Sequence, residues 1–334
     1  MLEVRIEKRL GAFQLHADFC ADGTLGLLGA SGSGKSVTLQ CIAGILRPDC
    51  GRIVLNGRVL FDSERRICLP PQKRNVGYLF QQYALFPNMT VSQNIYAGVR
   101  SGSRQEKQAV VAQALQTFRL TEVRDQHPHS LSGGQAQRTA LARMLVGKPE
   151  LLLLDEPFSA LDRHLGGTLA GELHSALASF SGDVLFVSHD RDEIRSFCPR
   201  ICVLDHGNTE PVVPTHSIFH DPHTIAAAKL AGFRNLFPAS LLPLLGIHMD
   251  SRCCVCIPET AVSLVSASDP DSVCCRVIWS RYENGVRLLE LRPNGFPMNL
   301  SLCMRQMDNS THKTDEEVWV QIDKNALFFL KYSA

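Results

Sequence analysis

A glycine-rich stretch around a single lysine is the part of this sequence best suited to chemistry. Residues 29–36 read GASGSGKS and follow the short apolar run at residues 25–28. In the spacing GxxxxGK[ST], backbone N–H groups point at phosphate oxygens, the lysine reaches the β- and γ-phosphates, and the final hydroxyl can bind Mg²⁺. The helix expected next, VTLQCIAGIL, adds its N-terminal partial positive charge. The pattern favours a nucleotide-phosphate site over a turn that binds nothing, with these ligands: Gly29, Ala30, Ser31, Gly32, Ser33, Gly34, Lys35, Ser36 and Val37.

A second stretch, LLLLDEP at residues 151–157, would bring two acids to the same place. Four consecutive leucines predict a fully buried parallel strand, and open α/β sheets bind ligands at the carboxyl ends of such strands. Asp155 would then hold Mg²⁺, directly or through a water. Glu156 would accept a proton from the water that attacks the γ-phosphate. The alternative is a buried strand that ends in an acidic turn without a catalytic role.

The stretch LSGGQ at residues 131–135 predicts a second anion site. The apolar spacing in AQRTALARMLVGK indicates a helix, so the glycines lie at its exposed N-terminus. One γ-phosphate does not need two separate glycine cradles and a magnesium ion. The pattern makes sense if two copies of the chain meet head to tail, each offering four residues to the ATP held by the other: Ser132, Gly133, Gly134 and Gln135.

Composition restricts the class of protein. A chain of 334 residues exceeds the usual domain size of about 100 to 200 residues, so we expect two or three domains. A net charge of +1 argues against nucleic acid as the main partner. No apolar segment approaches the ~20 residues of a membrane span, and the N-terminus alternates like a strand rather than a signal peptide. We therefore expect a cytoplasmic chain.

The twelve cysteines are scattered, and many lie in apolar runs where a thiol behaves as a small hydrophobe. A tighter group comprises Cys253, Cys254, Cys256, Cys274 and Cys275. It lacks paired CxxC spacing, and neighbours in a strand point to opposite faces. Reduced interior cysteines are the favoured interpretation, with a structural metal site as the alternative.

Together the motifs resemble those of an ABC-transporter nucleotide-binding subunit. Six stretches occur in the order and spacing of that family: GASGSGKS, FQQ at residues 80–82, LSGGQ, LLLLDEP, SALD at 159–162 and SHD at 188–190. The resemblance covers residues 1–235. It implies an ATPase that uses ATP and Mg²⁺, with Glu156 as the catalytic base, His189 as a contact of the γ-phosphate, and Gln81 at the attacking water. The implied metal ligands are Ser36, Gln81 and Asp155.

The resemblance also implies roles outside the phosphate site. Asp162 would tie the two cassettes of a dimer together at their interface. The family usually stacks the adenine on an aromatic ring before the phosphate loop, but this chain has Leu10 at that position. Phe13 is the nearest ring, and core packing is an equally good interpretation of it. We therefore expect weaker stacking on the base.

The fold class expected is α/β: a P-loop, RecA-like ABC cassette at residues 1–235, with an inserted helical subdomain at 83–135. Helical spacing in GSRQEKQAVVAQALQTFRL supports the insertion. A small C-terminal β-barrel, TOBE/MOP-like, is expected at residues 236–334. Short alternating runs separated by polar turns predict it, among them CIPETAVSLV, which partly resembles a strand of such accessory barrels.

The loop QQYALFPNMTVSQN exposes apolar residues around a proline, which favours a covering partner. In the family this loop receives the coupling helix of an integral membrane permease, and packing against the chain's own core is the alternative. Independently of this loop, the resemblance implies a homodimer of cassettes. It also implies a peripheral position at the cytoplasmic face of the membrane and an external solute-binding protein that acts indirectly.

The segment VLFDSERRICLPPQKRNVGYLFQQYALFP most resembles the ATPases of molybdate importers, with those of sulfate importers next. The expected function is ATP hydrolysis that powers import of an oxyanion, and molybdate is the favoured oxyanion. Sugar, polyamine and iron importers share the remaining motifs and stay open as alternatives. A soluble ABC ATPase acting on DNA or ribosomes is less favoured, because a heptad-bearing insertion and a second cassette are both missing. The intact motifs also argue against a sensor that does not hydrolyse ATP.

Overall fold

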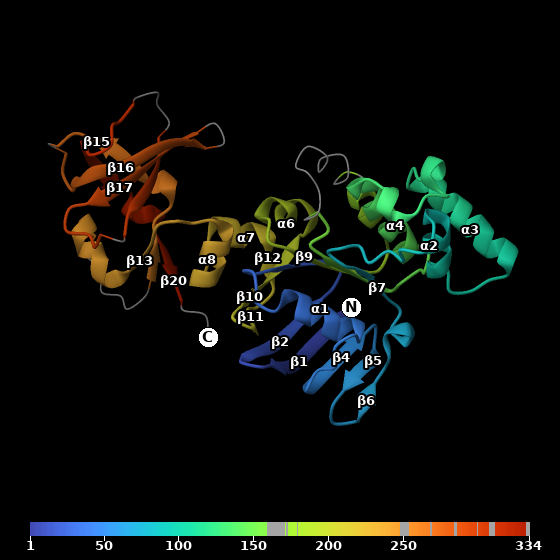
Figure 1. The fold of residues 1–334 in the computed structure, drawn as a ribbon. Helices are drawn as coiled ribbons and strands as arrows, with labels where there is room; N and C mark the ends of the chain where they lie inside the picture. The colour runs from blue at the N-terminus through green and yellow to red at the C-terminus, as the bar shows by residue number, and fades with distance from the viewer. Residues whose placement is uncertain are drawn as a thin grey trace. The chain divides into compact units, whose positions relative to one another are not determined.

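The computed structural model describes residues 1–158, 171, 173–178, 180–247, 254–267, 269–283, 286–298, 300–306 and 311–331 (Figure 1). Asp162 and the SALD stretch lie outside these residues. The chain divides into two compact units, Met1–Thr215 and His216–Ala334. The domain boundary expected between residues 235 and 236 stays a prediction.

The first unit is built on a mixed sheet of twelve strands. Its antiparallel part comprises β1 (Leu2–Leu10), β2 (Phe13–Ala21), β4 (Cys50–Leu55), β5 (Arg58–Asp62) and β6 (Ile67–Cys68). Its parallel part has the order β10-β3-β9-β8-β7, with β3 (Thr24–Leu28), β7 (Val76–Leu79), β8 (Leu151–Asp155), β9 (Asp183–Ser188) and β10 (Arg200–Asp205). The short strands β11 (Asn208–Thr209) and β12 (Val213–Pro214) pair with β10.

The parallel strands explain how distant motifs reach one edge of the sheet. The leucines of β8 are fully buried between β7 and β9, as the run LLLLDEP predicted. Because β3, β9, β8 and β7 run side by side and parallel, the segments that follow them emerge at the same edge. At the N-terminus the expected strand is a hairpin: β1 ends at Leu10, Gly11 turns the chain at φ 61°, and β2 begins at Phe13.

Some helices of the first unit contact the sheet, and three helices share an apolar core of their own. Among the described residues, the helices include α1 (Lys35–Ala43), α2 (Val91–Gly98), α3 (Arg104–Thr117), α4 (Gly133–Leu145) and α6 (Arg191–Phe197), with one-turn helices η1 (Pro71–Lys73), η2 (Thr121–Val123) and η3 (Pro128–Ser130). Residues of α2, α3 and α4 share an apolar core that includes Ile95, Leu115 and Ala142. A Ser or Thr cap with a Gln or Glu three residues later starts each of these helices. The expected helical subdomain at 83–135 therefore contains α2, α3 and the start of α4.

A buried arginine fixes the end of the helix that follows the glycine-rich loop. Arg74 is fully buried, and its guanidinium donates to the carbonyl oxygens of Cys41 and Ile42, both at 2.9 Å. These carbonyls belong to the last turn of α1, where the regular helix hydrogen bonds end, and Cys41 also accepts from the N–H of Gly44 at 3.2 Å. A cation there also suits the negative end of the helix dipole. Arg74 thus holds α1 in place from its far end.

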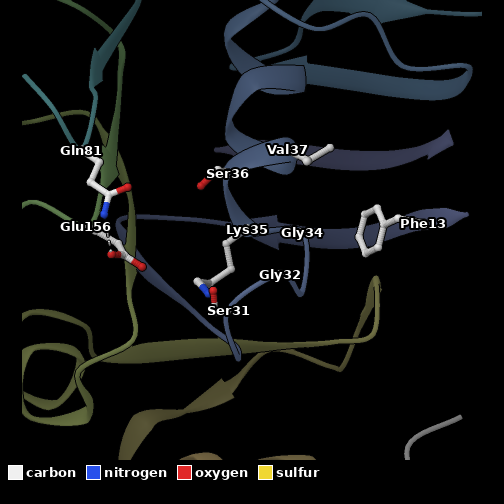
Figure 2. Close-up of a pocket in the computed structure, with 9 residues that line it drawn as sticks. All are labelled: Phe13, Ser31, Gly32, Gly34, Lys35, Ser36, Val37, Gln81 and Glu156. Carbon is white, nitrogen blue, oxygen red and sulfur yellow. Dashed lines mark hydrogen bonds between the residues drawn. The ribbon is translucent and has the colours of Figure 1, made fainter. Parts of the chain in front are cut away.

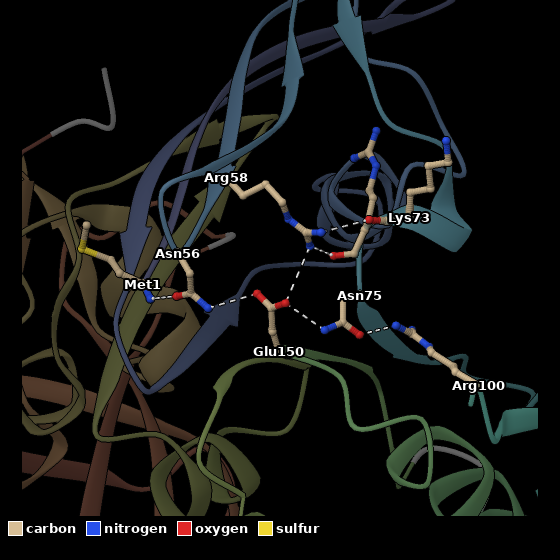
Figure 3. A network of polar contacts seen from close by, with 8 residues as sticks. Met1, Asn56, Arg58, Lys73, Asn75, Arg100 and Glu150 are labelled. Atoms are coloured by element: carbon tan, nitrogen blue, oxygen red, sulfur yellow. Dashed lines mark hydrogen bonds and ion pairs between the residues drawn. The ribbon is translucent and has the colours of Figure 1, made fainter. Parts of the chain in front are cut away.

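Polar contacts around Glu150 anchor the start of the acid-bearing strand (Figure 3). The Glu150 carboxylate accepts hydrogen bonds from Asn75 Nδ2 at 2.8 Å and from Asn56 Nδ2 at 3.3 Å. Arg100, after α2, donates to Asn75 Oδ1. The hydrogen bond from Asn75 is the main reason that the pKa of Glu150 is lowered. One carboxylate therefore links β8, the start of β7 and the antiparallel strands.

The second unit contains two sheets. One has the order β13-β14-β20, with β13 (Leu236–Pro238), β14 (Cys254–Cys256) and β20 (Phe328–Leu330). The other has the order β15-β19-β16-β17-β18, with β15 (Val262–Val265), β16 (Val273–Glu283), β17 (Val286–Pro293), β18 (Leu302–Gln306) and β19 (Glu317–Ile322). The helices are α7 (Thr215–His220), which begins at the division, α8 (Ile225–Ala231), and the 3₁₀ helices η4 (Ala239–Leu245), η5 (Glu259–Ala261) and η6 (Lys324–Ala326).

The run CIPETAVSLV is not one strand. It divides into the end of β14 and the whole of β15, which belong to different sheets. Pro258 has no N–H to donate to a strand ladder, and η5 follows it directly. The two sheets are compatible with a small barrel, and the TOBE/MOP-like barrel stays a prediction.

The described residues contain neither a membrane-spanning helix nor a cluster of metal-binding side chains. None of their helices combines the length and the apolar character required to span a bilayer. Nor do they bring together three His, Cys, Asp or Glu side chains in a way that could hold a metal ion. Cys253 lies outside the described residues. Cys256 and Cys275 are buried, and burial raises the pKa of each thiol to about 12.

Candidate functional site

A cavity of about 300 Å³ lies where the glycine-rich loop meets the ends of the parallel strands (Figure 2). Figure 2 shows Gln81 and Glu156 on one side, Phe13 on the opposite side, and Lys35 between them. The lining residues come from four segments: Phe13; Ser31, Gly32, Gly34, Lys35, Ser36 and Val37; Gln81; and Glu156. The structure therefore brings together residues that are far apart in the sequence.

The glycine-rich loop needs its glycines. Gly32 has φ 79° and Gly34 has φ 109°, in the left-handed region that other residues rarely adopt. A Cβ on Gly34 would also lie 2.8 Å from Cζ of Phe13, and one on Gly29 would lie 2.4 Å from the carbonyl oxygen of Leu204. The loop can therefore keep this course only with bare backbone.

The lysine ammonium lies over the loop. Lys35 Nζ donates to the carbonyl oxygens of Gly29 at 2.8 Å and Ala30 at 2.9 Å. Burial lowers the pKa of Lys35, and the nearby charges of Glu156 and Asp155 oppose this shift. An ammonium, the N-terminus of α1 and a bare backbone loop converge on one cavity, which is the donor set that a phosphate chain requires.

Two oxygen groups beside the lysine fit a magnesium ion. Ser36 Oγ donates to Asp155 Oδ1 at 3.1 Å, so both oxygens could reach one ion. Hard oxygen donors of this kind suit Mg²⁺. Burial is the main cause that raises the pKa of Asp155, while hydrogen bonds from Tyr78 and Ser36 act in the opposite direction.

Tyr78 is a site residue that sequence reasoning missed. Its hydroxyl donates to Asp155 Oδ2 at 3.0 Å, whereas Ser36 Oγ contacts the other carboxylate oxygen. Burial raises the pKa of Tyr78, so the phenol stays a donor. The only available signal was one polar aromatic residue in a short strand ahead of FQQ, and it did not indicate which acid Tyr78 would contact.

The Glu156 carboxylate contacts the two other predicted catalytic residues. Gln81 Nε2 donates to Glu156 Oε2 at 3.3 Å, and His189 Nδ1 lies 3.3 Å from Glu156 Oε1. The Glu156 side chain is 20% exposed and that of His189 is 63% exposed. The backbone of Glu156 has φ 47°, a strained value for a residue with a side chain.

The LSGGQ residues lie elsewhere. Gly133 is the first residue of α4, and Ser132 is its N-cap. The Ser132 hydroxyl accepts from the N–H of Gln135 at 3.3 Å, and Gln135 Oε1 accepts from the N–H of Ser132 at 2.9 Å. None of the described residues Ser132, Gly133, Gly134 and Gln135 lines the cavity. Their role toward a second chain stays a prediction.

Comparisons with known proteins agree with this geometry. Residues 13–159 match the sequence profile of a family described as "ABC transporter". The chain is 42% identical over 207 residues to "Molybdate/tungstate import ATP-binding protein WtpC" of Archaeoglobus fulgidus, covering 62% of this chain and 84% of the relative. It is 40% identical over 218 residues to "Fe(3+) ions import ATP-binding protein FbpC" of Haemophilus influenzae. That match covers 65% of this chain but only 62% of the relative's length.

A solved structure shares the fold. The dimeric post-hydrolysis state of the ATP-binding cassette MJ0796, bound to ADP and Pi, matches with a TM-score of 0.55 and 26% sequence identity. The match covers 64% of this chain and 99% of the cassette. From the sequence profile, the archaeal relative and this fold, we conclude that the chain belongs to the family of ABC transporter ATP-binding proteins.

Proposed function

We propose that the chain hydrolyses ATP as the cassette subunit of an importer. The observation that carries the proposal is the Glu156 carboxylate, held by Gln81 and His189 at a cavity that also contains Lys35 and its glycine-rich loop. Release of inorganic phosphate from ATP by the purified chain tests it. No release at any protein concentration would contradict the proposal.

In this mechanism Lys35 and the loop N–H groups bind the β- and γ-phosphates and place the γ-phosphorus opposite Glu156. Ser36, Gln81 and Asp155 would hold Mg²⁺, which when bound would neutralise charge on the phosphate oxygens. Gln81 donates directly to Glu156 on the same side of the cavity (Figure 2), so a water that contacts both side chains would be oriented by them.

Glu156 accepts the proton of the attacking water, and His189 contacts the γ-phosphate. A general base must lie within hydrogen-bond reach of the proton it removes, and the cavity leaves Glu156 directly accessible. The contact between His189 and Glu156 orients the carboxylate before a nucleotide arrives.

We propose that Phe13 takes the place of the missing adenine platform. Leu10 is 41% exposed and does not line the cavity, whereas Phe13 lies at the end of the cavity opposite Glu156. A nucleotide with its γ-phosphate at Glu156 would therefore bring its base toward the Phe13 ring. Phe13 also packs against the core of the unit, so both interpretations made from the sequence describe the same side chain.

Phe13→Ala should weaken ATP binding about tenfold, because stacking of a base on an aromatic ring contributes ~1–3 kcal/mol. Calorimetry would measure the dissociation constants of ATP and of inorganic triphosphate, which has no base. Triphosphate binding should stay within about twofold of the wild type, and Phe13→Trp should keep the ATP affinity. An equal loss for both ligands would show that Phe13 only supports the loop.

Tyr78→Phe should move the acid limb of the ATP hydrolysis profile to higher pH. Asp155 must be ionised to hold a metal ion, and the Tyr78 hydrogen bond lowers the pKa of that carboxyl against the effect of burial. Removing the hydroxyl raises the Asp155 pKa further, so activity is lost earlier as the pH falls. The profile of kcat/KM against pH measures the shift. Tyr96→Phe, on the exposed face of α2, is the control, and coincident profiles for Tyr78→Phe and the wild type would contradict this role.

We propose that the cassette works as a head-to-tail homodimer, each chain presenting Ser132, Gly133, Gly134 and Gln135 to the nucleotide of the other. The position of this helix N-terminus outside the chain's own cavity supports that arrangement. The chain would sit at the cytoplasmic face of the membrane as a peripheral subunit.

The permease contact is proposed for the loop that follows Gln81. Phe86 is 46% exposed and Met89 is 38% exposed, whereas Tyr83 of the same loop is buried. Arg143 of α4 contacts the loop at two points. Its guanidinium lies 5.0 Å from the centre of the Phe86 ring and donates to the Tyr83 carbonyl at 3.1 Å. The loop thus offers apolar side chains on a fixed backbone, as a docking site for a permease helix requires.

For the solute we propose an oxyanion, with molybdate as the favoured candidate. An external binding protein would deliver it. The 42% identity to WtpC supports molybdate or tungstate, and the 40% identity to FbpC makes iron the alternative that the test must exclude. Residues 236–334 would form the TOBE/MOP-like accessory barrel. Uptake by cells carrying the complete transporter, with molybdate, tungstate, sulfate and Fe³⁺ as competitors, tests the solute, and competition by Fe³⁺ alone would overturn it.

A further inference from the structure

Gln137 of α4 carries a buried amide that donates a hydrogen bond to an acceptor outside this helix. The side chain is fully buried, and Nε2 donates to the carbonyl oxygen of Pro157 at 2.9 Å. The amide oxygen of Gln137 has no hydrogen-bond partner in the described part of the chain. A buried, half-satisfied amide is unfavourable relative to an apolar side chain of similar size. Its one hydrogen bond therefore calls for an explanation other than stability.

The carbonyl that Gln137 contacts belongs to a strained segment. Glu156 has φ 47° and precedes Pro157, although a following proline disfavours helical backbone and a side chain disfavours positive φ. Such a conformation persists only when the surrounding structure holds it. On one side the N–H of Glu156 donates to the carbonyl of Val187 at 2.9 Å. Pro157 has no N–H to donate on the other side, but its carbonyl accepts from Gln137, which anchors the backbone directly after Glu156.

We propose that Gln137 is a positioning residue for ATP hydrolysis, which holds Pro157 and thereby keeps the Glu156 carboxylate against Gln81 and His189. The inference rests on the proposed function, because it assigns Glu156 the role of base. Gln137 touches neither the cavity nor the reacting atoms. It acts only through the backbone that carries the base.

The same contact joins two parts of the machinery. Gln137 follows Gln135 by two residues in α4, and the start of this helix is proposed to face the nucleotide of the other chain. Through Pro157 it reaches the base that acts on the chain's own nucleotide. One hydrogen bond therefore connects the first turns of α4 to the segment that carries Glu156.

Gln137→Met tests the inference, because methionine fills similar space without an N–H donor. We expect kcat for ATP hydrolysis to fall about 10- to 100-fold, since a small displacement of a catalytic group has effects of that size. The KM for ATP should stay within about twofold, because Lys35 and its loop are untouched. Gln137→Leu also lacks the donor and should lower kcat to a similar extent. Rates are expressed per ATP-binding site found by calorimetry, so an unfolded fraction does not enter them.

Thr139→Val is the matched control. Thr139 is as deeply buried in the same helix, but its hydroxyl donates to the carbonyl of Gln135 within that helix. This variant should lower the melting temperature and leave kcat per site within about twofold. A wild-type rate in Gln137→Met, or an equal loss of kcat in Thr139→Val, would overturn the positioning role while ATP hydrolysis itself stands. A wild-type chain that binds ATP without hydrolysing it would overturn both.

Discussion

Glu156→Gln is expected to bind ATP as the wild type does and to hydrolyse it at least about a hundredfold more slowly. The amide keeps the shape of the side chain and can still meet Gln81, but it cannot accept a proton at neutral pH. Lys35 and the glycine-rich loop bind the phosphates independently of this side chain. Because ATP then stays intact between the two cassettes, the ATP-bound dimer should accumulate.

Steady-state phosphate release and light scattering measure these two effects on one preparation. Glu150→Gln is the matched control, since this glutamate precedes the same strand but contacts Asn75 and Asn56 rather than the cavity. It should leave turnover per ATP-binding site close to that of the wild type. Unchanged turnover in Glu156→Gln would remove Glu156 from the role of base.

Ser132→Arg is expected to abolish hydrolysis while the single chain still binds ATP. Ser132 caps α4 and does not line the chain's own cavity, so the change leaves Lys35 and its loop intact. In a head-to-tail dimer the new side chain would occupy the place where the partner's γ-phosphate docks. A mixed dimer with one mutant chain should lose one of its two active sites.

Loss of a helix cap destabilises a protein by about 1 kcal/mol, and this effect has to be separated from the loss of a binding site. Ser103→Arg provides the control, because Ser103 caps α3 in the same reciprocal arrangement with Glu106. It should lower stability to a similar extent and spare hydrolysis. If Ser132→Arg prevents ATP binding by the single chain, the assignment of this helix to the partner's nucleotide is wrong.

The parts of the site that follow from the sequence are those with local patterns. The glycine-rich loop, the buried strand before Asp155 and the helix after Ser132 each occupy one stretch, and each has the expected structure. Their chemistry depends on residue type and spacing within a few positions, and a single sequence displays both. The helices of residues 83–135 were likewise indicated by apolar spacing, and their apolar core agrees with it.

The contacts missed from the sequence depend on tertiary packing. Tyr78 reaches Asp155 only because β7 lies next to β8 with Tyr78 opposite Leu153. Gln137 reaches Pro157 because α4 packs near the end of β8, and its glutamine looks like any polar helix residue in the sequence. The position of Phe13 next to Gly34 depends on the hairpin turn between β1 and β2, which the sequence did not predict.

The central claim is that two copies of this chain hydrolyse ATP together in the presence of Mg²⁺. The most direct measurement is phosphate release from ATP by the purified wild-type chain over a wide range of protein concentrations, with and without Mg²⁺. The account predicts Mg²⁺-dependent release whose rate per chain rises with protein concentration until the dimer is saturated. A rate per chain that is independent of concentration under conditions where light scattering shows monomers would contradict it, as would a chain that binds ATP and releases no phosphate.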